Sequence, residues 1–560
     1  MAETRIIYVK NKNGTTYVCE DTAFWNKEKK MPYHKRKTIG KLGPDGEVIY
    51  NEKYNARKEI EVLKSKDESL SPEVTRTTLV GQRMVLDKYS SELHLPKMLK
   101  SVFGKEVSDK ILALAYYIIC RGKALSNSAD WLADRGYADL GITSQRVSEL
   151  LKEITPDRRN TFFAGWIKAS AKSDAVLFDI SSISTYGRNL YNAEWGYNRD
   201  RESLEQINIS LLTTRTSNIP LWYDILPGSM SDVAVLTNTI RTVSKLGLGS
   251  VPFVQDRGFY SAENLEMLKK NGIKFMIPIP SGVNLSKEII AANKDLMVSP
   301  ENAVVLENEH VIYGKTIFRN TEYGRTWFHI YYDPMRKEQT LAGFMMKLRK
   351  CMDELLENKP RDGHKSLYDK YFIIKDTPKK GRRVEYNHEA IQEYMNSEVC
   401  YWVLMTTFEK EATAAYFTYR DRNDDELHFD DFKNAMDLCR LRCHSDEAVQ
   451  GKIFIHFIAL AILSRLRKSV KAIAPKERLY MNESEMLSKV ESYTRVHFEG
   501  KYKDVYSTPT KMQRKIFGLL GIAYDNNGAV VKPESTECDM QDEDQNPIEK
   551  ELANLTDQGQ

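Results

Sequence analysis

Residues 416–433 carry four polar side chains at a spacing that restricts how this stretch can fold. Tyr419, Arg422, Glu426 and Lys433 lie at offsets of 0, 3, 7 and 14. At about 100° per residue, a helix places all four on one stripe about 60° wide. An aromatic ring, a guanidinium, a carboxylate and an ammonium side by side suit a phosphodiester next to a metal ligand. A solvated helix face on which Arg422 pairs with Glu426 fits as well, and the spacing alone favours that second interpretation.

Two aspartates upstream follow apolar runs. Asp179 comes after residues 175–178, and Asp256 comes after residues 251–255. Each pattern predicts an acid at the end of a buried strand, and the second leads into a turn and a helix that begins near Ser261. Two strand-end aspartates with a helix-borne glutamate commonly hold divalent cations at a phosphate, because Mg²⁺ prefers hard oxygen ligands. A pair of such ions activates the attacking oxygen and stabilises the leaving one.

Together these residues resemble the signature of a known family. The spacing Tyr-x2-Arg-x3-Glu-x6-Lys, with Asp179 and the Asp-Arg-Gly-Phe segment at 256–259 upstream, is similar to that of the DDE transposases of bacterial insertion sequences. Within that family the pattern resembles the insertion-sequence-four type. The resemblance extends from about residue 170 to 470 and includes Gly-Ser-Met-Ser-Asp at 228–232. The spans of 77 residues between the aspartates and 170 residues to the glutamate are also similar to the family's.

The resemblance implies an α/β (α+β) fold with a ribonuclease H-like catalytic core and a strand-rich insertion before the glutamate helix. It implies a DNA transposase that performs cut-and-paste transposition by two-metal phosphoryl transfer. The element end is nicked first, and the freed 3′-OH then attacks target DNA. Asp179, Asp256 and Glu426 would be the catalytic residues and would bind two Mg²⁺ ions, with Mn²⁺ as an alternative.

The remaining signature residues are implied to bind DNA. Tyr419, Arg422 and Lys433 would contact phosphates beside the acids, and Arg257 is a further candidate because it directly follows Asp256. The implied partners are the inverted repeats at the element ends and the target DNA. Synapsis of two ends implies a homodimer on DNA. The expected location is the bacterial cytoplasm, on the nucleoid when bound to DNA, with no membrane partner.

Three alternatives to a transposase share parts of this pattern. A ribonuclease H-like nuclease that only hydrolyses DNA would use the same acids but would not join strands. A catalytically inactive DNA-binding relic of a transposase would keep the fold. A glycoside hydrolase also uses paired acids, but it would leave Arg422 and Lys433 without a role.

Composition restricts the function only weakly. The net charge of +4 hides an asymmetry, since residues 534–560 hold nine acids and one lysine and leave the rest of the 560-residue chain more basic. A basic body is compatible with a polyanionic partner. The seven cysteines lack the spacing of a zinc site and suit a reducing cytoplasm. The apolar runs 111–120 and 453–463 are too short to span a bilayer and predict buried helices.

Changes in pattern along the chain predict six regions. They are a strand-rich basic region with a linker (1–75), a helical, possible DNA-binding domain (76–170), the catalytic core (171–280 and 408–470), a strand-rich insertion (281–407), a helical region (471–525) and an acidic disordered tail (526–560).

Two of these regions carry further candidate DNA contacts. Asn13-Gly14 predicts a hairpin turn, and the nearby basic cluster 34–37, with Trp25 and Tyr33, fits either a DNA backbone contact or a solvated hairpin. Residues 126–135 and 143–151 read as helix, turn, helix. This pattern fits a DNA-binding motif about as well as a plain helical bundle. Ser108 is the predicted N-cap of a helix that runs to residue 121.

Overall fold

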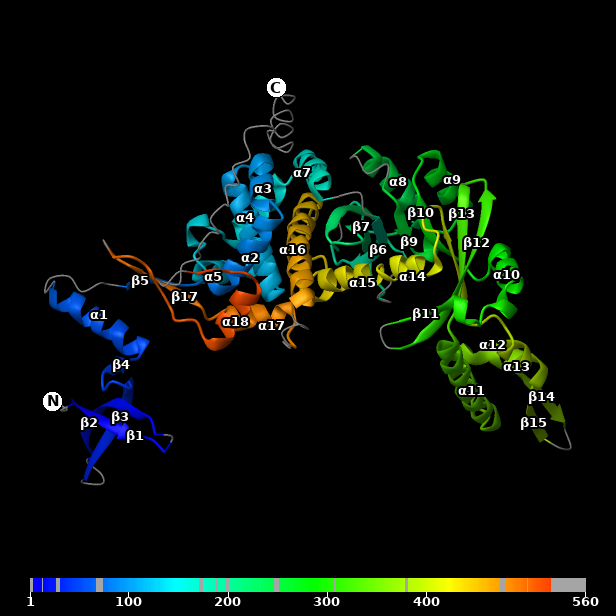
Figure 1. Ribbon diagram of the computed structural model, residues 1–560. Helices are drawn as coiled ribbons and strands as arrows, with labels where there is room; N and C mark the ends of the chain where they lie inside the picture. Colours follow the sequence, from blue (N-terminus) through cyan, green and yellow to red (C-terminus); the bar gives the residue numbers. More distant parts are fainter. Residues whose placement is uncertain are drawn as a thin grey trace. The chain divides into compact units, whose positions relative to one another are not determined.

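Figure 1 shows the computed structural model of the chain. The structure describes residues 4–12, 14–26, 31–66, 74–170, 175–187, 190–196, 202–230, 232–245, 251–306, 309–377, 381–473, 480–500 and 502–524. The chain forms two compact units, one of residues 1–77 with 495–505 and the other of residues 78–494 with 506–560. The predicted acidic tail lies outside the described residues.

The first unit is built on a four-stranded antiparallel sheet. Its strands, in spatial order, are β1 (Thr4–Lys10), β2 (Thr16–Asn26), β3 (Met31–Leu42) and β4 (Val48–Tyr50), and they confirm the predicted hairpins. Helix α1 (Glu52–Lys66) follows where the sequence predicted a linker. The Asn51 side chain accepts a hydrogen bond from the Tyr54 amide at 2.9 Å, and the glutamates and lysines that follow favour a helix. Strands β5 (Val74–Leu79), β17 (Thr494–Phe498) and β18 (Val505–Tyr506) form a small separate sheet.

The helical part of the second unit begins as predicted near residue 80. Its helices are α2 (Gly81–Glu92), α3 (Leu95–Phe103), α4 (Lys105–Arg121), α5 (Ala129–Asp134), α6 (Ser144–Glu153), α7 (Pro156–Ser170), α17 (Glu483–Val490) and α18 (Lys511–Leu519). The Ser108 prediction was wrong. Helix α4 begins one turn earlier, after Gly104, whose φ of 79° ends α3 and starts α4. The helix, turn, helix order around α5 and α6 is present, and its DNA-binding role stays a prediction.

A nine-stranded mixed sheet forms the centre of the second unit. Its order is β11-β12-β13-β16-β10-β9-β6-β7-β8. The strands are β6 (Val176–Ser184), β7 (Gln206–Thr214), β8 (Pro220–Pro227), β9 (Phe253–Gln255), β10 (Phe275–Ile279), β11 (Ala303–Val305), β12 (Val311–Thr321), β13 (Gly324–Tyr332) and β16 (Tyr401–Thr406). Strands β6, β9 and β10 run parallel, and the remaining pairs are antiparallel.

The predicted insertion 281–407 is therefore not a separate strand-rich domain. Strands β11, β12, β13 and β16 extend the central sheet, and β16 pairs with both β10 and β13. Only the middle part of the predicted insertion has a hydrophobic core of its own. Helices α11 (Pro334–Leu356), α12 (Lys365–Tyr371) and α13 (His388–Met395) pack with the hairpin of β14 (Phe372–Thr377) and β15 (Gly381–Tyr386) around a distinct apolar cluster. Strands β10 and β16 pair although they lie more than 120 residues apart in the sequence, and such pairing leaves no local pattern.

Helices cover both faces of the central sheet. On one face, α8 (Asp232–Lys245) and α9 (Ala262–Lys270) contribute to the main core with Phe178 and Phe253. On the other face, α14 (Ala412–Arg420) packs on Leu177 and Val254. Helix α15 (Asn423–Asp430) packs against β6. Because side chains alternate along a strand, residues 179 and 256 lie on the face that α14 covers.

A long apolar helix, α16 (Asp446–Ile473), joins the sheet to the helical part. By length and composition alone it could cross a membrane, but 89% of its most apolar 18-residue window is buried inside the protein. Residues 453–463 form a buried helix, as predicted. Gly451 lies against α6, where an added Cβ would stand 2.3 Å from the carbonyl oxygen of Leu151. These observations fit the core helix of a folded domain.

Candidate active site

The register between β6 and β9 brings Asp179 and Asp256 together. The two strands are parallel, and Phe178 pairs with Gln255, so the aspartates are the next residues on neighbouring strands. Asp256 directly follows β9, as predicted, and its Oδ1 accepts a hydrogen bond from the Arg257 amide at 2.7 Å. Asp179 is not at a strand end, and that prediction was wrong. Strand β6 continues to residue 184 because β7 pairs with it along its whole length.

Arg422 lies between the two carboxylates. Its Nη1 is 3.6 Å from Asp179 Oδ2 and its Nη2 is 3.9 Å from Asp256 Oδ1. The side chains of Arg422 and Asp179 are 12% and 7% exposed, so little water screens this contact. The sequence had offered a solvated face on which Arg422 pairs with Glu426. The burial of Arg422 excludes the solvated face.

Tyr419 supports the same arrangement from the last turn of α14. Its hydroxyl donates a hydrogen bond to Asp256 Oδ1 at 3.4 Å, and its ring centre is 5.7 Å from Arg422 Cζ. Burial raises the pKa of Tyr419 to about 12, and the charge of Arg422 opposes this shift. The hydroxyl therefore remains protonated and remains a donor at neutral pH.

The signature stretch is not the single α-helix that the stripe assumed. Helix α14 ends at Arg420, α15 begins at Asn423, and residues Asp431–Ala435 form a π-helical turn. Arg467 donates to both Asp431 oxygens, at 2.6 and 2.9 Å, and this ion pair fixes the π turn. The wider turn breaks the α-helical spacing between Arg422 and Lys433.

The structure places the other two signature positions, 426 and 433, in different detail. Residue 426 lies in α15, which packs on the strand that carries Asp179; its side chain lies outside the described residues. Lys433 is half-buried in the π turn. A hydrogen bond from Arg440 holds the pKa of Glu202 low, and the charge of Lys433 adds to this effect. Within the described part of the chain, Lys433 is not one of the residues around the cleft at Asp256.

A cleft of about 590 Å³ opens beside Asp256. Its lining consists of Asp256, Arg257, Pro278, Asp333, Arg336, Trp402, Tyr416, Tyr419, Arg420 and Arg422. Arg257 was a predicted site residue, whereas sequence reasoning missed Arg336 and Arg420. All three are exposed, and the described residues offer none of them an ion pair. Trp402 forms a wall of the cleft and stacks on Tyr331 with ring centres 5.2 Å apart.

The sequence contains a signal for one of the two missed arginines, Arg420, and none for the other, Arg336. Arg420 stands two residues before Arg422, so the sequence shows that it lies close to the signature residues. Arg336 begins α11, and nothing local connects it to Asp256. Only the pairing of β13 with β16, and of β16 with β10, brings the start of α11 to this cleft.

The donor set of this site fits a hard divalent cation. Both aspartates direct a carboxylate oxygen to within 4 Å of one guanidinium, so the two carboxylates converge on one region of space. Carboxylate oxygens are the ligands that Mg²⁺ and Mn²⁺ take in proteins. In the structure the positive charge between the acids comes from Arg422.

Comparison with known proteins gives one strong match. A family model described as "Transposase DDE domain" matches residues 170–462, which is more than half of the chain and includes both aspartates and position 426. Among solved structures, the chain is similar to a "piggyBac transposase synaptic complex with hairpin DNA". The identity is 10%, the TM-score is 0.37, and the match covers 79% of this chain and 83% of the other. No curated protein matches the chain.

Proposed function

The chain belongs to the DDE transposase family, and we propose that Asp179, Asp256 and Glu426 are its catalytic acids in cut-and-paste DNA transposition. Transposition, and with it DNA recombination, is the activity of this family, and members generally use divalent metal ions. DNA is accordingly the substrate.

One observation carries the proposal. Asp179 and Asp256 are neighbours across two parallel strands, and a single guanidinium lies within 4 Å of both carboxylates. Packing of α15 on β6 supports the third assignment, because it brings the helix that includes residue 426 to the strand that carries Asp179. The strand order β8-β7-β6-β9-β10, with helices on both faces, supports a ribonuclease H-like core.

Each residue near the acids has a distinct role. Bound Mg²⁺ ions would supply activation of the attacking oxygen and stabilisation of the leaving oxygen. Asp179, Asp256 and Glu426 hold them, and Tyr419 orients Asp256 through its hydrogen bond. Arg422 presents two nitrogens in a fork that suits two phosphate oxygens.

Further cations would grip the DNA strand on either side. Arg257, Arg336 and Arg420 line the cleft beside Asp256, and no described carboxylate forms an ion pair with them, so a phosphate could contact all three. Lys433 would contact a phosphate on the side away from this cleft.

The finer features of the family pattern complete the proposal. The signature spacing supports an element of the insertion-sequence-four type from a bacterium, which acts in the cytoplasm on the nucleoid. Nicking at the element end would be followed by attack of the freed 3′-OH on the opposite strand, which closes a hairpin. Hydrolysis of the hairpin by water would free the 3′-OH again, and that hydroxyl would then attack target DNA. Synapsis of two ends would require a homodimer on DNA. Mg²⁺ is the proposed ion, with Mn²⁺ as a substitute.

An assay for cleavage and strand transfer on element-end duplexes tests this proposal. Wild-type protein with Mg²⁺ should nick the end and then join it to target DNA. Asp256→Asn should do neither, while Asp369→Asn, a change at an exposed aspartate of α12, should behave as wild type. Hydrolysis without joining would establish the nuclease alternative instead. DNA binding with no cleavage by the wild type would indicate an inactive relic.

A further inference from the structure

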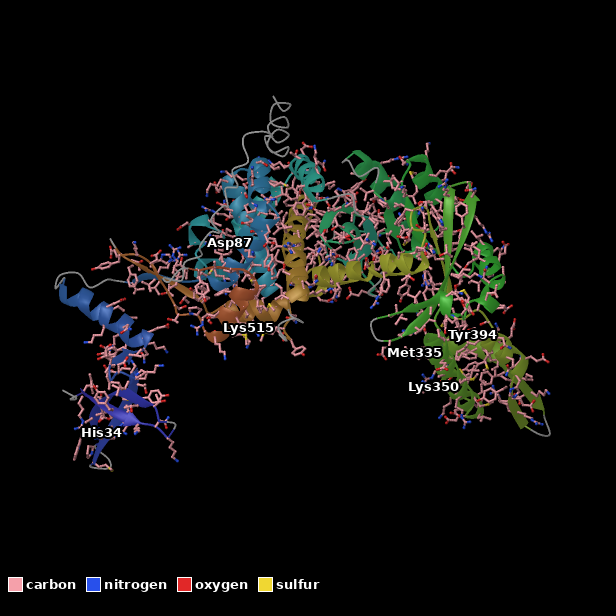
Figure 2. All side chains as sticks on the ribbon, in the orientation of Figure 1. His34, Asp87, Met335, Lys350, Tyr394 and Lys515 are labelled. Carbon is pink, nitrogen blue, oxygen red and sulfur yellow. The ribbon has the colours of Figure 1, made fainter. Side chains whose placement is uncertain are left out.

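The four-stranded sheet of the first unit ends in a two-stranded ribbon. The pairing of β1 with β2 ends at Thr4 and Thr22, and β4 pairs only with residues 40–42 of β3. From Ala23 and His34 to Asn26 and Met31, β2 and β3 pair only with each other. Every residue of β3 from 31 to 38 is exposed, and Figure 2 labels His34 on this sheet. The ribbon thus extends past its neighbouring strands, with nothing described covering it.

The described part of the ribbon that adjoins residues 27–30, here called the apolar end, carries four exposed apolar side chains. Phe24, Trp25, Met31 and Tyr33 are between 40% and 65% exposed. The rings of Phe24 and Tyr33 lie 5.7 Å apart, and Pro32 pairs with Trp25. Exposed strand edges in soluble proteins usually carry charged side chains that prevent association. Four large apolar side chains gathered at the end of a ribbon instead indicate a surface that a partner covers.

The stem of the ribbon is basic. Lys35, Arg36 and Lys37 follow one another along β3. The buried carboxylate of Asp21 already contacts Arg5, His34 and Arg36, and Arg57 binds Glu20. The described residues supply no ion pair for Lys35 or Lys37. Glu20 and Asp21 are fewer than the basic side chains around them, so the stem presents a net positive charge.

We propose that this ribbon, residues 23–26 and 31–37, inserts into a groove of duplex DNA. A two-stranded ribbon fits the major groove, which is about 12 Å wide. Lys35 and Lys37 contact the backbone phosphates, and the apolar end packs on base edges, where the thymine methyl group offers an apolar contact. A second copy of the chain would bring like charges together at the stem, so the charge favours DNA. The proposal rests on the DNA transposase function only for the identity of the polyanion.

Paired substitutions in the full chain separate the ribbon from the rest of the sheet. Trp25→Ala with Tyr33→Ala truncates two of the four apolar side chains, and Lys35→Ala with Lys37→Ala removes two positive charges. Tyr8→Ala and Lys10→Ala are matched controls, since these exposed residues lie at the far end of β1. All targets are exposed, so thermal unfolding should be unchanged in every variant. That measurement excludes misfolding as a cause of lost binding.

Binding to a labelled duplex gives the decisive result. The lysine pair should flatten the slope of log K against log salt by about 1.8, which corresponds to two phosphate contacts. The aromatic pair should weaken binding about tenfold or more at constant slope, which corresponds to roughly one lost base contact. Both controls should match wild type. Trp25→Phe should keep the affinity and lose part of the fluorescence quenching on DNA.

Two other outcomes would overturn the proposal. Equal DNA affinity for all variants would show that the ribbon does not bind DNA. A change in oligomeric state of the Trp25 and Tyr33 variant, with unchanged DNA affinity, would assign the ribbon to contact between copies. The same titration on an Asp179→Asn background keeps this test apart from catalysis. Ribbon-dependent binding by a wild-type protein that cleaves no end duplex with Mg²⁺ would refute the proposed function and leave the groove contact standing.

Discussion

The cleft at Asp256 and the ribbon of the first unit are both rich in aromatic and charged side chains, yet they hold them in opposite ways. At the cleft, Asp179 and Arg422 are buried and neutralise each other. On the ribbon, Lys35 and Trp25 are exposed, and no described carboxylate forms an ion pair with Lys35. The acids owe their positions to strand register, which fixes them before any ligand arrives. The ribbon has only its two strands to support it, so a partner can approach both faces. The fixed carboxylates of the cleft suit a catalytic reaction, and the accessible side chains of the ribbon suit binding of a partner.

The largest expected effect separates the two regions by function. Asp179→Asn removes a proposed metal ligand and should lower the rate of end cleavage by about three orders of magnitude or more. Binding of end DNA, which on our proposal draws on the ribbon, should stay within about twofold of wild type. Single-turnover cleavage and a binding titration on the same duplex check both values. If Asp179→Asn lost binding as severely as cleavage, the separation between the regions would be wrong.

The second prediction compares the tolerance of the two regions to substitution. Gly451→Ala places a Cβ 2.3 Å from the Leu151 carbonyl oxygen, where α16 meets α6. Overpacking of this kind costs about 1–3 kcal/mol of unfolding free energy. Trp25→Ala in the ribbon should cost nothing measurable, because Trp25 is exposed. Denaturant unfolding of both variants tests this contrast, and equal stability would mean that α16 can shift away from α6.

A third prediction uses pH to probe the sheet beside the cleft. His329 is buried in β13, its Nδ1 lies 2.9 Å from the Thr316 hydroxyl, and burial lowers its pKa to about 4. The unfolded chain takes up a proton near pH 6.5 and the folded chain does not, so stability is present above pH 6.5 and falls below it. His329 should account for about 2 kcal/mol of lost stability at pH 5. His329→Gln should flatten this part of the curve in chemical denaturation between pH 7 and 5. An unchanged curve would place the pH dependence elsewhere.

The smallest expected effect concerns Arg422, which links metal and DNA at the cleft. Arg422→Ala removes the positive charge between the two carboxylates, so Mn²⁺ affinity without DNA should rise several-fold, because the ion no longer competes with a buried guanidinium for their oxygens. The salt slope of DNA binding should become shallower by about 0.9, because one phosphate contact is lost. Titration of Mn²⁺ by electron paramagnetic resonance gives the first value. Arg349→Ala, which breaks an exposed ion pair on α11, is the control. If Arg422→Ala bound Mn²⁺ more weakly than this control, Arg422 would support the two carboxylates and would not compete with the metal ion.

Many helices and strands could be predicted from the local sequence pattern. The prediction differs from the structure where pairing with a strand far away in the sequence determines how long a strand is. Asp256 stands at its predicted strand end because the apolar run before it is short and a turn follows. Asp179 looked like a strand end because serines follow it. Those serines are buried, since β7 and the covering helices enclose both faces of β6. The burial of polar residues in a central strand cannot be read from the strand itself.

Within the candidate site, the sequence spacing predicted which residues come together, but it did not predict the helix breaks that position them. Asp179, Asp256, Tyr419 and Arg422 lie together, as the signature spacing suggested. The turn at residues 421–422 and the π turn at 431–435 could not be foreseen, because a helical spacing rule assumes an unbroken helix. Arg336 was beyond local reasoning, as it reaches the cleft only through the pairing of β13, β16 and β10.

The late position of β16 in the chain affects when a catalytic site first exists during synthesis. Asp256, the later of the two aspartates, precedes the start of β16 at Tyr401 by 145 residues and the start of α15 at Asn423 by 167 residues. Until these later segments have been made, Leu177 and Val254 have no helix over them, and the acids have neither Arg422 nor position 426 beside them. A chain cut short by a premature stop codon before residue 400 would carry two of the three acids and no enclosed site. We therefore expect nascent and truncated products to be inert toward the genome that encodes them.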